Sequence, residues 1–356
     1  MQPAKSEVKW VEINLRVVRA NVRWIVSQLA PKTALMAVVK EDAYGHGGAE
    51  ISREAVRGGA SSLGVLTVRE AAVLRRAGVK EPIQVLAPVL PSAARDIFKW
   101  KLIPTIDDLS QARAIDAAAP ASGAAAHVDL NFGLGRWGIS PRDTENFLEA
   151  LSRLRRLRLR GLSTHIDYVP GKNAVEAEEK LSSFSALATR LKKRFPGLVC
   201  HAANSSVLVD FPHRQMDMVR IGNLLYGVKP ASLSAPIRSP WSLKARIVSL
   251  REVERGRSIG YAGEYIAPRR MRVGTVLCGY ADGVAMEPAE RFISLGPGFQ
   301  YWGVVRGRKA PFIGRCGIAH ILVDVTDVPD ACRGDIVALP ARRTATSSRV
   351  PRFYLG

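Results

Sequence analysis

Cysteine is scarce in this chain, and long apolar runs are absent. Only four of the 356 residues are cysteines, and they lie far apart without paired spacing: Cys200, Cys278, Cys316 and Cys332. We therefore expect reduced, buried thiols rather than a disulfide framework or a zinc site, and no bound metal. No apolar run reaches the roughly 18 residues that a membrane span requires. The N-terminal segment has no secretory signal pattern, so we expect a cytoplasmic protein with no membrane partner.

Acidic residues are also few. The sequence has 32 Asp and Glu residues against 52 Lys and Arg residues, which gives a net charge of +20. Such an excess attracts nucleic acid or anionic lipid at low salt. The basic residues are scattered, however, apart from 151–161 and the Arg-rich tail, and no nucleic-acid-binding motif is present. We expect no specific nucleic-acid partner; a basic host proteome or an anionic substrate explains the charge as well.

The length favours two domains, and residues 8–228 read as an α/β domain. Short, continuous apolar runs alternate there with amphipathic helical patterns such as 68–78 and 178–195, as in a parallel sheet covered on both faces. The eight runs are 33–40, 61–68, 82–89, 102–106, 125–131, 160–166, 198–205 and 218–222. Eight strands with eight crossovers predict a (β/α)8 TIM-like barrel. A doubly wound open sheet is the alternative, but its glycine fingerprint between strand and helix is missing.

A second domain follows a segment rich in proline and serine at 229–240, which reads as a linker. Beyond it, short β-rich runs are separated by glycines, which is typical of an all-β domain. We therefore predict a barrel domain over 1–232 and a mostly-β domain over 233–356.

Lys40 is the first candidate for chemistry, because it ends the first predicted barrel strand. Catalytic residues of such barrels lie at the carboxyl ends of strands. The apolar neighbours Met36, Val38 and Val39 desolvate the amine, which lowers its pKa towards nucleophilic use. The glycine-rich loop that follows, with Tyr44 in it, predicts a flexible segment whose backbone can approach a ligand.

The loops after the last two predicted strands suit a phosphate group. They read Asn204-Ser205-Ser206 and Ile221-Gly222-Asn223, small or hydroxylated residues whose backbone amides can face an anion. Phosphate sites in such barrels commonly lie in these loops. Asn, Ser and Gly also make ordinary turns, but together with Lys40 they outline a site for a phosphorylated aldehyde.

The run AVVKEDAYGHG around Lys40 resembles the pyridoxal-phosphate (PLP) lysine signature of the alanine racemase family. Further stretches match that family in order along the whole chain: HVDLNFGLGRWGIS, LRGLSTHID, HAANSSVLVDFP, MVRIGNLLYG, IGYAGEY, CGYADG, GRCGIAHILVDVTD and RVPRFYLG. The resemblance implies a homodimer in which each barrel site is completed by the β domain of the partner. It also implies racemisation of L- and D-alanine, which feeds peptidoglycan synthesis.

The resemblance implies two acid–base groups. Lys40 matches the lysine that forms the Schiff base with PLP and also transfers a proton, and Tyr261 matches the tyrosine that serves as the opposed base from the other subunit. Racemisation requires this pairing, because the Cα proton leaves one face and returns at the other. Tyrosine has an ordinary pKa of about 10, so its use as a base requires cationic neighbours.

The remaining matched residues concern binding of cofactor and substrate. Arg220 matches the arginine at the pyridine nitrogen, where a guanidinium can only donate a hydrogen bond, so the ring stays unprotonated and is a weaker electron sink. His165 resembles the histidine that orients this arginine. Other matches are the phosphate-side residues Tyr44, Tyr354, Ser205, Gly222 and Asn204, the substrate-side residues Arg136, Tyr280 and Ile318, and Asp282 in a structural role.

Several positions depart from the family pattern. Asp129 stands where a carbamylated lysine often holds the arginine, so we expect it to pair with Arg136. Ile318 replaces a methionine that acts through its backbone, Ala319 replaces an aspartate, and Phe132 replaces a smaller polar residue. Alanine is the expected substrate, with serine or a larger amino acid as an alternative.

Three other readings stay open. A PLP-dependent decarboxylase of the same fold is disfavoured by Arg220 and by the motif of Tyr261. A non-catalytic PLP carrier is disfavoured by the β domain, which such proteins generally lack. A basic binding protein built on a degenerate racemase is suggested by the charge of +20 and by Ala319.

Overall fold

A computed structural model describes residues 3–229, 233–284, 301–341, 346 and 348–356. The chain divides into two compact units, a barrel unit of residues 16–239 and a β unit of residues 1–15 and 240–356. This division differs from the ranges 1–232 and 233–356 expected from the sequence. The first 15 residues belong to the β unit because the strand at 9–14 pairs with strands 241–253 and 352–355. Residues 230–232 of the expected linker lie outside the described residues.

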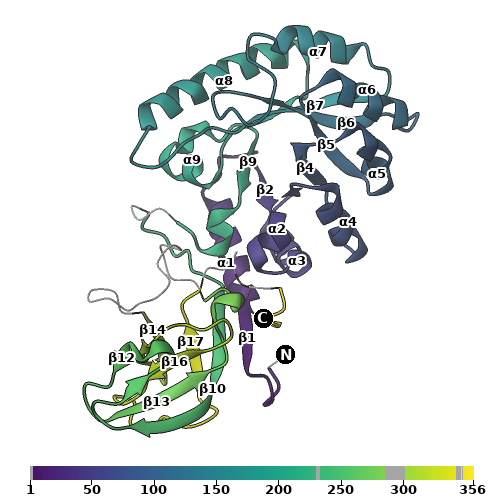
Figure 1. Ribbon diagram of the computed structural model, residues 1–356. Coiled ribbons are helices and arrows are strands. Elements are labelled where there is room, and N and C mark those ends of the chain that lie inside the picture. The colour runs from purple at the N-terminus through teal and green to yellow at the C-terminus, as the bar shows by residue number, and fades with distance from the viewer. Residues whose placement is uncertain (1–2, 230–232, 285–300, 342–345, 347) are drawn as a thin grey trace. The chain divides into compact units, whose positions relative to one another are not determined.

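The barrel unit contains the eight predicted strands, all parallel. They are β2 (Ala34–Val38), β3 (Ser62–Val65), β4 (Ile83–Pro88), β5 (Leu102–Ile106), β6 (Ala124–Leu130), β7 (Leu157–Thr164), β8 (Val199–His201) and β9 (Met218–Ile221). Their order is β8-β7-β6-β5-β4-β3-β2-β9. The backbone bonds from Asp217 N–H to Cys200 O and from Arg220 N–H to Ala203 O join β8 to β9. The sheet therefore closes as a barrel, and the open-sheet alternative is wrong (Figure 1).

Helices connect these strands and cover the sheet. They are α1 (Leu15–Ser27), α2 (Lys40–Gly45), α3 (Gly48–Gly58), α4 (Val68–Arg76), α5 (Ala94–Lys99), α6 (Leu109–Ala118), α7 (Thr144–Ser152), α8 (Ala174–Arg194) and α9 (Ser205–Asp210). Local signals set their starts: Thr67 and Glu70 form a capping box on α4, and the Asp108 carboxylate caps α6. Residues three or four apart on α8 are buried, among them Leu181 and Phe184, so an apolar stripe holds this helix in place.

The β unit is built mostly of β-strands, as predicted, and all but one of the strand pairings within its described residues are antiparallel. The strands are β1 (Lys9–Asn14), β10 (Trp241–Val253), β11 (Ser258–Ile259), β12 (Tyr265–Ile266), β13 (Met271–Val276), β14 (Trp302–Val305), β15 (Arg308–Ile313), β16 (Ile321–Asp324), β17 (Ile336–Leu339) and β18 (Arg352–Leu355). The main sheet runs β13-β16-β15-β14-β17-β10-β1-β18. β10 also pairs with β13 at one end of the sheet, and its register shifts between Ile247 and Ser249, so the long strand bends there.

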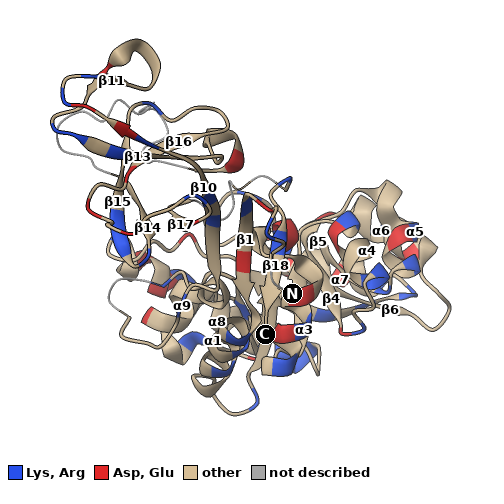
Figure 2. Cartoon of the chain, turned by 90° about the horizontal axis from the view of Figure 1, so that it is seen from below, with Lys and Arg blue, Asp and Glu red and all other residues tan. Residues whose placement is uncertain are grey.

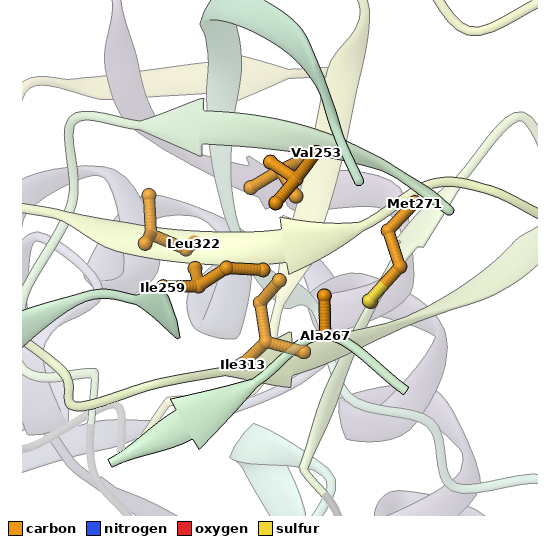
Figure 3. Close-up of a cluster of buried hydrophobic side chains, with 7 residues drawn as sticks. Val253, Ile259, Ala267, Met271, Ile313 and Leu322 are labelled. Carbon is orange, nitrogen blue, oxygen red and sulfur yellow. The ribbon is translucent and has the colours of Figure 1, made fainter. Parts of the chain in front are cut away.

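A compact apolar cluster lies in the β unit (Figure 3). Its members come from β10, β11, β13, β15, β16 and the turn after β12: Val253, Ile259, Ala267, Met271, Val273, Ile313 and Leu322. All of them are buried, so the cluster removes apolar surface of five strands from water.

The cysteines and the charged residues are distributed over both units. All four cysteines are free thiols: Cys200 and Cys278 are buried, whereas Cys332 is exposed, contrary to the expectation of uniformly buried thiols. Lysine and arginine residues occur along both units (Figure 2). Within the described parts of the chain, no helix combines the length and apolar character needed to cross a bilayer. The described residues also contain no group of three or more His, Cys, Asp or Glu side chains placed to hold a metal ion.

We predict that Met271→Ala lowers the free energy of unfolding of the β unit by about 2–5 kcal/mol, because it leaves a cavity in the buried cluster. Ile266→Ala is the matched control, since Ile266 is 53% exposed and its loss should change stability by less than about 0.5 kcal/mol. Urea denaturation followed by circular dichroism measures both. Equal effects of the two substitutions would contradict the assignment of the cluster as a core.

Candidate active site

A cavity of about 300 Å³ opens at the carboxyl ends of the barrel strands. Its wall includes residues at or just after the ends of β2, β3, β4, β6, β7 and β9, together with the start of α9. Eight of the predicted site residues border this cavity: Lys40, Tyr44, Arg136, His165, Asn204, Ser205, Arg220 and Gly222. The structure thus brings them together, and their roles stay predictions.

Lys40 opens an unusual left-handed turn. The four residues from Glu41 to Tyr44 all have φ between 50° and 55°, a conformation that costs roughly 1–2 kcal/mol for each L-residue. Surrounding groups hold the turn: Glu41 N–H donates to Glu70 Oε1 over 2.6 Å, and Gly48 N–H donates to Asp42 Oδ1 over 2.7 Å. The segment is therefore a fixed turn and not the flexible loop expected from its glycines.

The turn brings Lys40 and Tyr44 to one side of the cavity. Lys40 Nζ lies 5.9 Å from the centroid of the Tyr44 ring. Burial lowers the pKa of Lys40, and the nearby Arg136 guanidinium lowers it further, while Glu70 and Glu41 act in the opposite direction. A larger share of the amine is therefore uncharged at neutral pH, which a nucleophilic lysine requires.

Arg220 is a buried cation at the end of β9. Its Nη1 donates to His201 O and to His201 Nδ1, each over 2.6 Å, and its Nη2 donates to Thr164 O over 2.6 Å. Burial lowers the pKa of Arg220 to about 10, so the guanidinium remains charged at neutral pH. It therefore needs and receives several acceptors.

A chain of two histidines extends from this arginine. Since His201 Nδ1 accepts from Arg220, its proton resides on Nε2 and is donated to His127 Nδ1, which lies 2.8 Å away. The prediction that His165 holds Arg220 is wrong for direct contact, because His201 makes this bond. His165 instead borders the cavity. His201 was missed because a single histidine in an apolar strand reads as an ordinary core residue.

The predicted phosphate side consists of a close approach between two loops. A Cβ atom added to Gly222 would lie 2.6 Å from the Tyr44 hydroxyl oxygen, so only glycine leaves this space. Ser205 lies beside Gly222, and its hydroxyl accepts a 3.4 Å hydrogen bond from Leu224 N–H. The Asn204 side-chain oxygen caps α9 through Ser206 N–H and Val207 N–H, so this residue borders the cavity as a helix cap.

Asp129 and Arg136 border the same cavity, but they do not form the expected pair. No ion pair within 4 Å joins them among the described residues. Asp129 accepts the Ser163 hydroxyl proton over 2.5 Å instead. Burial raises the pKa of Asp129 to about 6, and the nearby Ser163, Arg220, Arg136 and Trp137 partly oppose this rise. The carboxyl group is therefore mostly ionised at neutral pH.

The structure adds residues that the sequence analysis did not select. Trp137, Ser163 and Tyr168 all border the cavity. Only weak sequence features marked them as site residues: Ser163 lies in the predicted strand 160–166, and Trp137 directly follows Arg136. Phe132 packs edge-on against Phe184 of α8, with 5.6 Å between ring centroids, and so supports α8.

The remaining predicted site residues belong to the β unit. Tyr261, Tyr280 and Ile318 are 60%, 52% and 59% exposed. Backbone bonds from Tyr280 N–H to Gly317 O and from Ala281 N–H to Ile318 O tie the last two into one loop pair. Tyr354 lies in β18, opposite Ile13 of β1. The roles of these four residues towards cofactor and substrate stay predictions.

Asp282 has the structural environment that was predicted for it. Its carboxylate pairs with Lys9 over 2.8 Å and accepts a hydrogen bond from Gly279 N–H over 3.0 Å. The residue is buried, so the pair fixes the start of the Tyr280 turn to β1.

Comparison with known proteins gives matches along almost the whole chain. Residues 13–230 match the family model described as "Alanine racemase, N-terminal domain", and residues 241–351 match "Alanine racemase, C-terminal domain". An alanine racemase of Halothermothrix orenii is 34% identical over 336 residues, which cover 93% of this chain and 86% of the relative.

Two solved structures show the same architecture. An alanine racemase of Clostridium difficile 630 has a TM-score of 0.88 at 26% identity and covers 98% of this chain and 96% of its own. The alanine racemase of Bacillus anthracis with bound L-Ala-P has a TM-score of 0.85 at 26% identity, with coverage of 100% and 96%.

We predict that acidification destabilises the barrel unit because its buried histidines must stay neutral. Burial, with a further contribution from Arg220, lowers the pKa of His127 to about 4 and that of His165 to about 3, from 6.5. The unfolded chain therefore binds protons first as the pH falls below 6.5. Each of the two histidines should cost roughly 2 kcal/mol between pH 7 and pH 4.5.

The raised pKa of Asp129 acts in the opposite direction below pH 6 and offsets only part of this loss. Urea denaturation across this pH range measures the net effect, and ¹⁵N chemical shifts should show neutral His127 and His165 rings at pH 5.5. Protonated rings at that pH in the folded protein would contradict the buried, neutral assignment.

Proposed function

Because the chain belongs to the alanine racemase family, we propose that it interconverts L-alanine and D-alanine with PLP as its cofactor. The observation that carries the proposal is the meeting of Lys40, Arg220 and the Gly222–Tyr44 approach in one cavity. An amine, a cation and a set of small or hydroxylated residues that can face a phosphate group are the three features that a phosphorylated pyridine aldehyde requires.

The residues present fit this cofactor. Lys40 supplies the amine, and its lowered pKa makes it available for attachment to the aldehyde. Bound PLP supplies a ring that accepts the electron pair released when the Cα proton of an amino acid leaves. Gly222, Tyr44 and Ser205 border the cavity together and would receive the phosphate group, and a side chain at Gly222 would collide with the Tyr44 hydroxyl.

Arg220 would face the ring nitrogen of the cofactor. Its guanidinium is held by carbonyl oxygens of Thr164 and His201 and by the His201 ring, so it cannot turn away. A guanidinium donates hydrogen bonds and does not give up its proton. Arg220 therefore keeps the ring nitrogen unprotonated, which limits electron withdrawal and favours simple proton return over other reactions of the substrate.

Arg136 would receive the substrate carboxylate. Arg136 and Lys40 border the same cavity, and the guanidinium contributes to lowering the pKa of the lysine. Lys40 would then move the Cα proton on one face of the substrate, and Tyr261 would do so on the opposite face. Two bases on opposed faces are the minimum that racemisation requires.

Tyr261 lies in the β unit and is largely exposed there. We propose that it acts in the cavity of a second copy, so that the protein is a homodimer with shared active sites. The exposed side chains Tyr261, Tyr280 and Ile318 support this, because a solvent-facing group of aromatic and aliphatic residues is typical of an interface. Tyr354 would approach the cofactor phosphate.

The substrate and the cellular role rest on the family. Alanine is the substrate that the family name supports. The site does not favour the decarboxylase alternative, because the residue that would face the ring nitrogen of the cofactor is the cation Arg220 and not a carboxylate. Supply of D-alanine to peptidoglycan and a cytoplasmic location stay predictions of the sequence.

We predict that Lys40→Ala abolishes the visible absorbance that PLP gives the purified protein and lowers racemisation by on the order of 10³-fold or more. Racemisation is measured by chiral chromatography of L-alanine incubations, and Cα exchange by deuterium uptake from deuterated water. Lys101→Ala, an exposed lysine on the same unit, is the control and should change neither. A Lys40→Ala protein that keeps both colour and activity would refute the proposal.

We predict that Tyr261→Phe keeps the cofactor absorbance and loses racemisation by about 10²–10⁴-fold, because one of the two bases is removed. Tyr265→Phe, in the same segment, is the matched control and should retain activity. Mixing Lys40→Ala and Tyr261→Phe protomers by refolding should restore about a quarter of wild-type activity, since half the dimers are mixed and each has one intact site of two. No recovery on mixing would contradict shared active sites.

A further inference from the structure

The Arg136 guanidinium stacks on the indole ring of its chain neighbour Trp137. The central guanidinium carbon lies 3.6 Å from the ring centroid, and both residues border the barrel cavity. The other cation–ring pairs found among the described residues are separated by 4.1 Å or more. Cation–ring contacts of this kind contribute about 0.5–2 kcal/mol, depending on desolvation.

The Asp129 carboxylate lies beside the stack, and Trp137 and Arg136 both lower its pKa against the effect of burial. It accepts the Ser163 hydroxyl proton over 2.5 Å. Asp129 and Ser163 lie opposite each other in the ladder between β6 and β7, and Asp129 is only 7% exposed. The carboxylate is thus a fixed point of the barrel. Because an indole has a single N–H donor, a bond to that point would set the direction of the ring plane.

The backbone of the segment is fixed as well. Ile139 N–H donates to Asp129 O and Asn131 N–H donates to Ile139 O, each over 2.9 Å, so the loop returns to β6 at its end. Gly138, with φ +105°, makes the return, and a Cβ atom there would lie 2.9 Å from Asn131 N. The main chain around Trp137 is therefore held against β6.

We propose that Trp137, anchored by Asp129, is a positioning residue that holds the Arg136 guanidinium ready for the substrate carboxylate. The inference rests on the proposed function, which assigns that carboxylate to Arg136. A direct carboxylate–guanidinium pair occupies two in-plane N–H donors. A ring contacts the face of the guanidinium and leaves the in-plane donors available for a ligand. The stack thus fixes the arginine without consuming its binding capacity.

The test uses the holoenzyme and propionate, a carboxylate without an amine, titrated by calorimetry. Trp137→Leu removes the ring and should raise the propionate Kd and the alanine KM about tenfold, with kcat within about twofold. Trp137→Phe keeps a smaller ring without the N–H and should give an intermediate effect. Trp100→Leu is the matched control, because Trp100 also stacks with cations, Arg76 and Lys99, but does not border this cavity.

Unchanged propionate binding in Trp137→Leu would overturn the proposal, as would a loss of kcat without a change in KM. If the wild-type holoenzyme does not racemise alanine, the proposed function fails, while the propionate titration still decides the role of Trp137.

A double-mutant cycle tests the anchoring step. Asp129→Ala should weaken propionate binding several-fold in the wild-type background. It should have little further effect when combined with Trp137→Leu, because Asp129 acts on Arg136 through the Trp137 ring. Asp129→Asn keeps an acceptor for the indole N–H and should bind propionate more tightly than Asp129→Ala. It replaces Asp129→Ala in the cycle if the alanine variant does not fold. Equal effects of Asp129→Ala in both backgrounds would show that Asp129 acts independently and would overturn the anchoring.

Discussion

A single buried cation, the guanidinium of Arg220, determines the electrostatics of the barrel cavity. Burying a charge is costly unless hydrogen bonds replace the lost water. The acceptors here are carbonyl groups at the ends of β7 and β8 and the ring of His201. Neighbouring groups respond to the charge: together with burial it lowers the pKa of His127 and His165, and it favours the ionised form of Asp129. The histidines around the arginine are therefore neutral acceptors and donors.

The cavity that results is cationic. Lys40, Arg136 and Arg220 border it, against the buried carboxylate of Asp129. Such a site suits a ligand with one phosphate and one carboxylate group. The left-handed turn after Lys40 places four residues in a strained backbone conformation. Such strain persists only where surrounding groups hold the backbone, as the Glu41–Glu70 and Gly48–Asp42 hydrogen bonds do here. These bonds keep Lys40 at the end of its strand and in the cavity.

The barrel was predictable because buried parallel strands leave a direct signature of short, continuous apolar runs. All eight runs became strands, and Lys40, Gly222 and Arg220 lie at their ends. Pairings distant in sequence left no such signature. β1 lies within the range 1–232 that we assigned to the barrel domain, yet it pairs with β10 and β18 of the β unit.

The side-chain partners of the two arginines could not be predicted from sequence spacing either. His201 and not His165 holds Arg220, and Arg136 stacks on Trp137 although a charge pair with Asp129 was expected. The choice between such partners depends on differences of a few ångströms in side-chain position, which the order of residues does not encode locally. In the proposed homodimer, the roles of the β-unit residues Tyr261, Tyr280, Ile318 and Tyr354 would depend on a second copy of the chain, whose position a single sequence does not encode.

The central claim is that the amine of Lys40 carries the cofactor. Borohydride reduction of the PLP-loaded protein, followed by proteolysis and mass spectrometry of the peptides, tests it most directly. The account predicts a single modified peptide that contains Lys40 and has gained the mass of a reduced pyridoxyl phosphate group. Modification of another lysine in place of Lys40, or of none, would contradict it.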